Sequence, residues 1–246
     1  MTEALRRKLT NAGRVLASQD QGDFVAGHVT VRLPDDPQCF LMKPATIGLD
    51  EMTPDTIITV DLEGRKVSGT MPRHNEVFIH SEVLRARPDV QAVVHTHAPH
   101  AVAFSSLGRE LVPVSNEAGY FYKKLPVFAE TTDLIVTPDR GKAVARCLGP
   151  HGAAILRNHG IVTAGRTIEE AVWLALKLER ACRVNCWRNA RAPRSSWPMP
   201  RTWRARTGAA TAAISTITFS TTSSAAGADF TASPTTPAAP SATRPM

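Results

Sequence analysis

The stretch HNEVFIHSEVLRARPDVQAVVHTHAPH, residues 74–100, contains the local patterns that decide the fold. Residues 74–87 predict a helix, which Pro88 stops. The apolar run at 91–95 (QAVVH) predicts a strand that ends in the sequence His95-Thr96-His97. Side chains two residues apart on a strand face the same side, so both imidazoles can reach one metal ion.

The sequence on both sides of this stretch continues an α/β pattern. Residues 3–18 carry apolar side chains at helical spacing and predict an amphipathic opening helix. A second long helix is predicted from Thr167, where TIEE has the capping-box arrangement. Short apolar runs separated by turn sequences predict strands at 28–33, 39–42, 57–61 and 153–157. Strands joined by short turns favour an antiparallel sheet flanked by helices over a doubly wound sheet.

Composition excludes several classes of protein. The 246 residues, of which 43% are hydrophobic, suffice for one sizeable domain or two small ones. No apolar run reaches the roughly 18 residues of a spanning helix, and the N-terminus lacks the apolar core of a secretion signal. The four cysteines show neither CxxC spacing nor a small-protein disulfide framework. We therefore expect a reduced, cytoplasmic protein without a membrane partner.

The last quarter of the chain differs from the rest. Residues 187–246 lack Leu, Val, Lys, Glu, His and Tyr, and consist mostly of Ala, Thr, Ser, Pro and Arg. They hold seven arginines against one acid, Asp229, so the net charge of +7 belongs largely to this tail and gives no reason to expect nucleic-acid binding. Two domains are predicted: a catalytic domain at 1–185 and a low-complexity tail at 186–246.

Two interpretations of the tail remain open. Such a segment buries too little apolar surface to offset its ordering entropy, so it can be a natural disordered tail. It can also be an out-of-frame translation of a GC-rich gene, which the abrupt change within a well-formed helix favours. In that case an adjacent frame from about codon 185 encodes a helical end containing Leu and Glu, and resequencing the DNA distinguishes the two.

Three histidines and one glutamate are candidates for a metal site. His159 in the sequence LRNHG lies between a strand and a glycine turn, and would join His95 and His97 as a third nitrogen ligand with a position left open. Glu76, at the start of the helix before the histidine strand, is a candidate fourth ligand or acid/base. The spacing fits equally a hydrogen-bonded histidine cluster and a solvated glutamate at a helix N-terminus.

These motifs together resemble the class II aldolase/adducin family. The resemblance rests on residues 74–100, on ILRNHGIVTAGRTIEEA and LERACRV, and on the earlier segments GHVTVR and KPATIGLDEMTPDTIITVD. It implies a three-layer α/β/α fold around a mainly antiparallel sheet, and a cyclic homotetramer. It also implies a divalent metal held by His95, His97 and His159, with Glu76 as an acid/base that can touch the metal. Three imidazoles suit zinc, manganese, iron or cobalt.

The chain departs from the sugar-phosphate aldolases of that family at the phosphate site. Those enzymes hold the phosphate with a Gly-Asn, a Thr-Gly and a Ser-Ser pair. The corresponding pairs here read Gly27-His28, Ala45-Thr46 and His74-Asn75. Small hydroxyl and backbone donors suit a phosphate, whereas bulkier side chains suit another group.

Five residues are therefore candidates for substrate binding. Basic side chains in place of the phosphate cradle can bind carboxylates through charge-assisted hydrogen bonds, although each one alone also fits a solvated charge. The candidates are His28, Lys43, Arg73, His74 and Asn75.

The preferred function is a metal-dependent carbon–carbon lyase acting on a small carboxylate. The substrate would be a hydroxylated aromatic dicarboxylate or a carboxylated ring-cleavage dienoate from aromatic catabolism, since family members without the phosphate cradle include such decarboxylases. Loss of carbon dioxide leaves an enolate or dienolate, to which Glu76, or a water it orients, delivers a proton. The alternative is an aldolase or epimerase acting on a sugar or sugar phosphate. A non-catalytic, adducin-like interaction protein is a third class, which the intact Glu76 and histidines disfavour.

Overall fold

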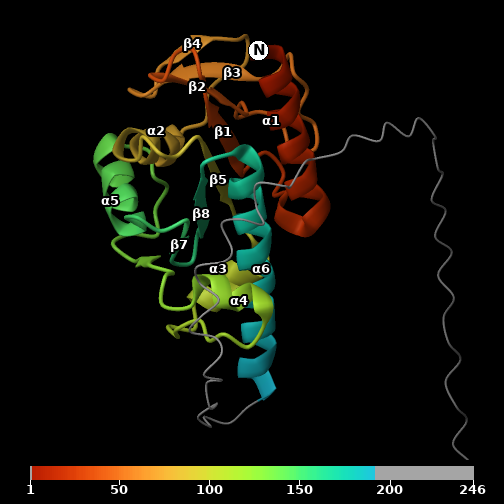
Figure 1. Ribbon diagram of the computed structural model, residues 1–246, viewed down its shortest axis with the longest axis vertical. Helices are drawn as coiled ribbons and strands as arrows, with labels where there is room; N and C mark the ends of the chain where they lie inside the picture. The colour runs from red at the N-terminus through yellow and green to blue at the C-terminus, as the bar shows by residue number, and fades with distance from the viewer. Residues whose placement is uncertain (1, 192–246) are drawn as a thin grey trace, which may run out of the picture.

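The computed structural model describes residues 2–191, which contain one mixed sheet (Figure 1). Its strand order is β4-β3-β2-β1-β5-β8-β7-β6. Neighbouring strands are antiparallel except β6 and β7, which are parallel. The strands are β1 (His28–Arg32), β2 (Cys39–Met42), β3 (Ile58–Asp61), β4 (Lys66–Ser68), β5 (Ala92–Thr96), β6 (Val127–Phe128), β7 (Ala153–Leu156) and β8 (Gly160–Gly165).

Helices cover both faces of the sheet and so make three layers, as the sequence predicted. Helices α2 and α5 lie on one face, and α1, α3, α4 and α6 lie on the other (Figure 1). The helical segments are α1 (Thr2–Leu16), the π-helical η1 (Ala17–Gln21), α2 (Val77–Ala86), α3 (Pro99–Ser105), α4 (Asn116–Phe121), α5 (Pro138–Leu148) and α6 (Ile168–Arg191). No helix within residues 2–191 is long and apolar enough to cross a membrane.

Side chains along the central strands β1 and β5 point alternately to the two faces of the sheet. This alternation separates two hydrophobic cores and places the candidate site on one face. Val29 and Val94 pack in the core beneath α1 and α6, while Val93 packs in the core beneath α2 and α5. Because side chains alternate along a strand, His95 points to the same face as Val93. The register pairs His28 directly with His95, which brings both rings to the α2 face of the sheet.

The bounds of two helices differ from the predicted ones. The helix predicted at 74–87 begins at Val77, so that Glu76 is its N-cap residue. At the start of α6, the predicted cap is present, and the Thr167 hydroxyl accepts a hydrogen bond from the backbone of Glu170. Helix α6 continues through residues 186–191, past the predicted domain boundary at 185. The rest of the predicted tail, 192–246, lies outside the described residues.

Candidate metal centre

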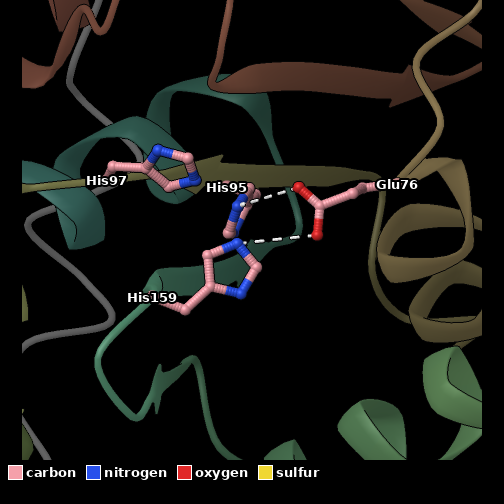
Figure 2. A group of neighbouring side chains, drawn as sticks. All are labelled: Glu76, His95, His97 and His159. Carbon is pink, nitrogen blue, oxygen red and sulfur yellow. Dashed lines mark ion pairs between the residues drawn. The ribbon is translucent and has the colours of Figure 1, made fainter. Parts of the chain in front are cut away.

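Four side chains from separate parts of the chain converge on the α2 face of the sheet (Figure 2). His95 lies in β5 and His97 directly follows it, while His159 lies in the turn between β7 and β8. Glu76 enters from the N-terminus of α2. One nitrogen of each imidazole and one carboxylate oxygen all lie within 4.8 Å of one another. The structure thus brings together the four residues predicted as metal ligands.

Hydrogen bonds orient two of these imidazoles toward the common centre. The Nδ1 atom of His95 donates to the carbonyl oxygen of Ile161 at 2.9 Å, and Nδ1 of His97 donates to Asp23 Oδ2 at 2.8 Å. An oxygen that only accepts requires a proton on the facing Nδ1, so Nε2 of each neutral ring carries its lone pair. Histidines that ligate metals are commonly fixed in this way.

The nitrogen atoms that face the centre of the cluster show whether a cation fits there. The Nε2 atoms of His95, His97 and His159 are all buried and have no hydrogen-bond partner. Buried polar atoms are rarely left unpaired, and the lone pairs of His95 and His97 have no proton to donate to the carboxylate. A divalent cation with nitrogen and oxygen preference matches this donor set.

Glu76 is held as a carboxylate that faces the histidines. Its Oε2 lies 3.8 Å from Nε2 of His95, and its Oε1 lies 3.5 Å from Nε2 of His159 (Figure 2). The backbone N–H of Ile135 donates to Oε1 at 2.8 Å. Burial alone would raise the pKa of Glu76, but His159 and His28 beside the carboxylate bring the pKa well below its usual range. Glu76 is therefore held as a carboxylate, which suits it to bind a cation.

Gly160 explains why the third histidine is followed by glycine. A Cβ atom at this position would lie 2.5 Å from the carbonyl oxygen of Thr96, 3.1 Å from the His97 ring and 3.2 Å from the His95 ring. A larger residue would clash with the Thr96 carbonyl and displace the rings of His95 and His97. Asn158, two residues earlier, has a φ of 55°, which makes the tight turn that aims His159 inward.

The sequence profile of the class II aldolase and adducin N-terminal domain matches residues 7–186, which include this whole site. The chain belongs to the class II aldolase and adducin family. Its most similar relatives include Decarboxylase NovR of Streptomyces niveus, 37% identical over 66% of this chain and 61% of the relative. Another is the meiotically up-regulated gene 14 protein of Schizosaccharomyces pombe, 31% identical over 70% of this chain and 68% of the relative.

Solved structures of class II aldolases share the fold. L-fuculose 1-phosphate aldolase from Glaciozyma antarctica superimposes with a TM-score of 0.73 at 31% identity, over 83% of this chain and 80% of that one. The chain spans about three fifths of the length of Decarboxylase NovR and of a second relative, named 4-hydroxy-3-prenylphenylpyruvate oxygenase/4-hydroxy-3-prenylbenzoate synthase. The family membership confirms the resemblance and the fold that the sequence predicted.

Two of the five predicted substrate residues, His28 and His74, pack together beside the candidate metal centre. Their ring centroids are 4.1 Å apart, and His28 lies 3.9 Å from Glu76 through its Nε2 atom. Burial lowers the pKa of His74 to about 4 and lowers that of His28 well below its ordinary value. These shifts favour the neutral imidazoles, so a carboxylate contact at His28 or His74 would use a neutral N–H, and substrate binding by these residues stays a prediction.

The remaining candidates occupy three different environments. Lys43 is fully buried, and its ammonium donates to the carbonyl oxygens of Val25, Pro44 and Ile47 at 2.9, 2.9 and 2.6 Å. These bonds use all three of its donors, so Lys43 holds two loops together and has none left for a substrate. Arg73 is half-buried, donates to the carbonyl of His74 and lies over the Phe78 ring; Asn75 is exposed.

Loss of the Lys43 ammonium is expected to destabilise the protein. We expect Lys43→Met to lower the free energy of unfolding by about 2–5 kcal/mol, because three carbonyl groups lose their donor. Urea unfolding measures the difference. Lys142→Met is the matched control, since Lys142 pairs with Asp139 at the surface and its loss should change stability by less than about 0.5 kcal/mol. Equal stability of the wild-type protein and Lys43→Met would contradict this structural role.

Several residues that build the candidate metal centre were not predicted. Asp23 and the carbonyl of Ile161 orient two histidines, and the N–H of Ile135 fixes Glu76. Asp23 lies more than seventy residues from His97 in the chain and carries no local motif. The position of a backbone group such as the Ile161 carbonyl has no signal in the sequence. The glycine after His159, by contrast, indicates that there is little space for a side chain at that position.

Proposed function

We propose that this protein is a metal-dependent carbon–carbon lyase that decarboxylates a hydroxylated aromatic carboxylate. In this proposal His95, His97 and His159 hold the cation together with Glu76. When bound, a divalent cation stabilises negative charge that develops on a substrate oxygen. The protein's own residues orient the substrate and move its proton.

The neutral His28–His74 pair is the observation that carries this proposal. The family resemblance implies that these two residues stand at positions of the phosphate cradle in the sugar-phosphate aldolases. A phosphate dianion is bound by cations and by clustered N–H or O–H donors. Here both rings are uncharged, and the ammonium of the buried Lys43 donates all three of its hydrogen bonds to backbone carbonyls. This arrangement lacks the clustered donors of a phosphate cradle. Arg73, which precedes His74 in the chain, is the remaining cationic candidate for binding the substrate carboxylate.

Glu76 is suited to move the proton that decarboxylation requires. When the bond to the carboxylate breaks, its electron pair stays on the ring carbon, and carbon dioxide leaves. That carbon must then take up a proton. As an ionised carboxylate, Glu76 can take the proton of a substrate hydroxyl and return it to the carbon, directly or through a water, so that it ends in its starting state.

Two exposed apolar side chains are neighbours in the chain of residues that build the site, and we propose that they contact the aromatic ring of the substrate. Phe24 is 93% exposed and is adjacent to Asp23, the residue that orients His97. Leu134 is 52% exposed and is adjacent to Ile135, whose N–H binds Glu76. Exposed apolar groups next to a polar cluster are typical of pockets that bind a ring and read its substituents.

The relatives support two candidate reactions. The name Decarboxylase NovR agrees with decarboxylation, and the likeness to L-fuculose 1-phosphate aldolase agrees with aldol cleavage as the second candidate. Both reactions break a carbon–carbon bond beside an oxygen whose charge must be stabilised. The altered phosphate site favours the first.

A substrate panel tests the proposal. With manganese, zinc or cobalt added, we expect hydroxylated aromatic dicarboxylates and ring-cleavage dienoates to release carbon dioxide, measured by a coupled bicarbonate assay. Fuculose and ribulose phosphates should not be cleaved, because the neutral His28–His74 pair offers a phosphate no charge. Efficient turnover of a sugar phosphate without decarboxylation across the panel would replace the proposal by the aldolase alternative.

A further inference from the structure

A buried amide anchors the segment that leads into the candidate metal centre. Residues 17–26 connect helix α1 to strand β1, and Gln21 is the one residue among them that is buried. Its Nε2 donates a hydrogen bond to the carbonyl oxygen of Ala175 in α6 at 3.1 Å. Its Oε1 accepts a hydrogen bond from the hydroxyl of Thr96 at 2.7 Å. The Gln21 side chain therefore attaches this segment to both α6 and β5.

The two partners fix the direction in which the amide faces. A carbonyl oxygen only accepts, so the NH₂ group of Gln21 faces Ala175 and its oxygen faces Thr96. Thr96 stands between His95 and His97 in the chain. Because side chains alternate along a strand, the Thr96 hydroxyl points to the face of the sheet opposite the His95 ring. Gln21 thus binds β5 from the α6 face, on the reverse side of the strand from the proposed metal ligands.

Asp23, two residues after Gln21, contacts a proposed ligand directly. Its Oδ2 accepts from Nδ1 of His97 at 2.8 Å, although the Asp23 side chain is 44% exposed. Such a half-exposed contact is weak by itself, because water competes for both groups and a free side chain loses entropy when it is fixed. Its strength depends on how the adjacent backbone is held. Lys43 holds the chain after Asp23 through the carbonyl of Val25, and Gln21 holds the chain before it.

The backbone of this segment has a conformation that requires such anchoring. Asp20 and Phe24, which flank Gln21 and Asp23, have φ angles of 59° and 47°. Residues other than glycine rarely adopt this left-handed region, and they keep it where surrounding contacts hold them in place. The two hydrogen bonds of the buried Gln21 amide supply contacts of this kind.

We propose that Gln21 is a positioning residue of the candidate metal centre: it fixes Asp23 as the partner of His97 and thereby raises the affinity of the site for its cation. This inference deepens the proposed function and rests on the metal centre in it. Groups that orient metal ligands commonly contribute about tenfold to a hundredfold to metal affinity. Asp23 is such a group, and Gln21 acts one contact further out, through Asp23.

A double-mutant cycle on zinc affinity tests this route. Competition with a chromophoric chelator measures zinc binding by the wild-type protein, Gln21→Met, Asp23→Ala and the double variant. Methionine fills the buried position of Gln21 but makes neither of its hydrogen bonds. We expect Gln21→Met to bind zinc about fivefold more weakly, as the loss of one hydrogen bond implies, and Asp23→Ala about tenfold or more.

The double variant should bind zinc as weakly as Asp23→Ala and no more so, because Gln21 acts through Asp23. Losses that multiply in the double variant would show that Gln21 affects the site by another route, and would overturn the proposal. Wild-type zinc affinity in Gln21→Met would overturn it as well.

Asn185→Leu is the matched control for a general loss of stability. Asn185 is a second buried amide on α6, and it binds both backbone groups of Val112 away from the histidine cluster. Urea unfolding of the metal-free proteins should show that Asn185→Leu and Gln21→Met are both destabilised. Asn185→Leu should nevertheless keep the zinc affinity of the wild-type protein. An equal loss of zinc affinity in both variants would overturn the positioning role of Gln21.

Thr96→Val tests the same contact if Gln21→Met does not fold. Valine keeps the shape of threonine but lacks the hydroxyl that donates to Gln21, so we expect the same loss of about fivefold in zinc affinity. Unchanged affinity in this variant would contradict the inference. If the wild-type protein bound no zinc, the proposed metal centre and this inference would both be wrong. Zinc binding without decarboxylation would remove the proposed reaction and leave the role of Gln21 standing.

Discussion

His95→Ala is expected to remove both bound metal and activity. We expect purified wild-type protein to carry about one divalent ion per chain and the variant to carry almost none. The lost imidazole lies at the centre of the cluster, with its ring 5.2 Å from that of His97 and 5.0 Å from that of His159. Turnover should fall by at least about a hundredfold, because even mutating the partners that orient metal ligands commonly costs that much. Elemental analysis after dialysis measures the metal.

His151→Ala provides the matched control for this loss. His151 lies in the segment just before β7 and is not part of the four-residue cluster, so its removal should leave the metal content unchanged. His97→Ala should behave like His95→Ala. Equal metal content in the wild-type protein and in both cluster variants would rule out the proposed metal centre.

Glu76→Gln is expected to slow the reaction far more than it weakens substrate binding. The amide oxygen can still accept from the Ile135 N–H, so the side chain should keep its position. An amide cannot take up and return a proton, and general acid–base groups contribute about 10²–10⁴-fold to rates. We therefore expect kcat to fall by about that factor while KM changes by less than about tenfold. Steady-state kinetics at saturating metal measures both constants.

Glu82→Gln is the control on the same helix. Glu82 is buried on α2 and pairs with Arg85, away from the histidine cluster. Its replacement should leave kcat within a few-fold of the wild-type value. If Glu76→Gln kept the wild-type kcat, or lost activity only through a raised KM, Glu76 would be a binding residue and not the proton carrier.

The sequence predicted the central part of the fold because that part has strong local patterns. The runs at 28–33 and 39–42 and the helix from Thr167 all appear close to their predicted bounds. Other elements were not predicted for identifiable reasons. Strand β4 is exposed along its length and β6 has two residues, so neither carries an apolar alternation. Strand β8 begins and ends in glycine, which weakens its strand signal although it is fully buried.

The candidate site was predictable in its ligand types and not in its surroundings. An HxH strand and an Asn-His-Gly turn mark nitrogen donors in any fold that brings them together. The charge of a side chain, by contrast, depends on burial. Lys43 and His74 look cationic in the sequence, but one is enclosed by carbonyl oxygens and the other is desolvated to a pKa of about 4. Sequence alone does not contain that distinction.

The proposed ligands and the proposed substrate contacts come from different halves of the chain. Residues 76–159 supply all four ligands and include β5, β6 and β7. The segment before them supplies His28, the exposed Phe24 and the loops that Lys43 joins. The first half also contacts the ligands at two places, because Asp23 orients His97 and His28 lies 3.9 Å from Glu76. Substrate range can therefore diverge through changes in the first half that keep Asp23 and His28, which makes exchange of the remaining residues of 22–47 between relatives a direct route to new substrates.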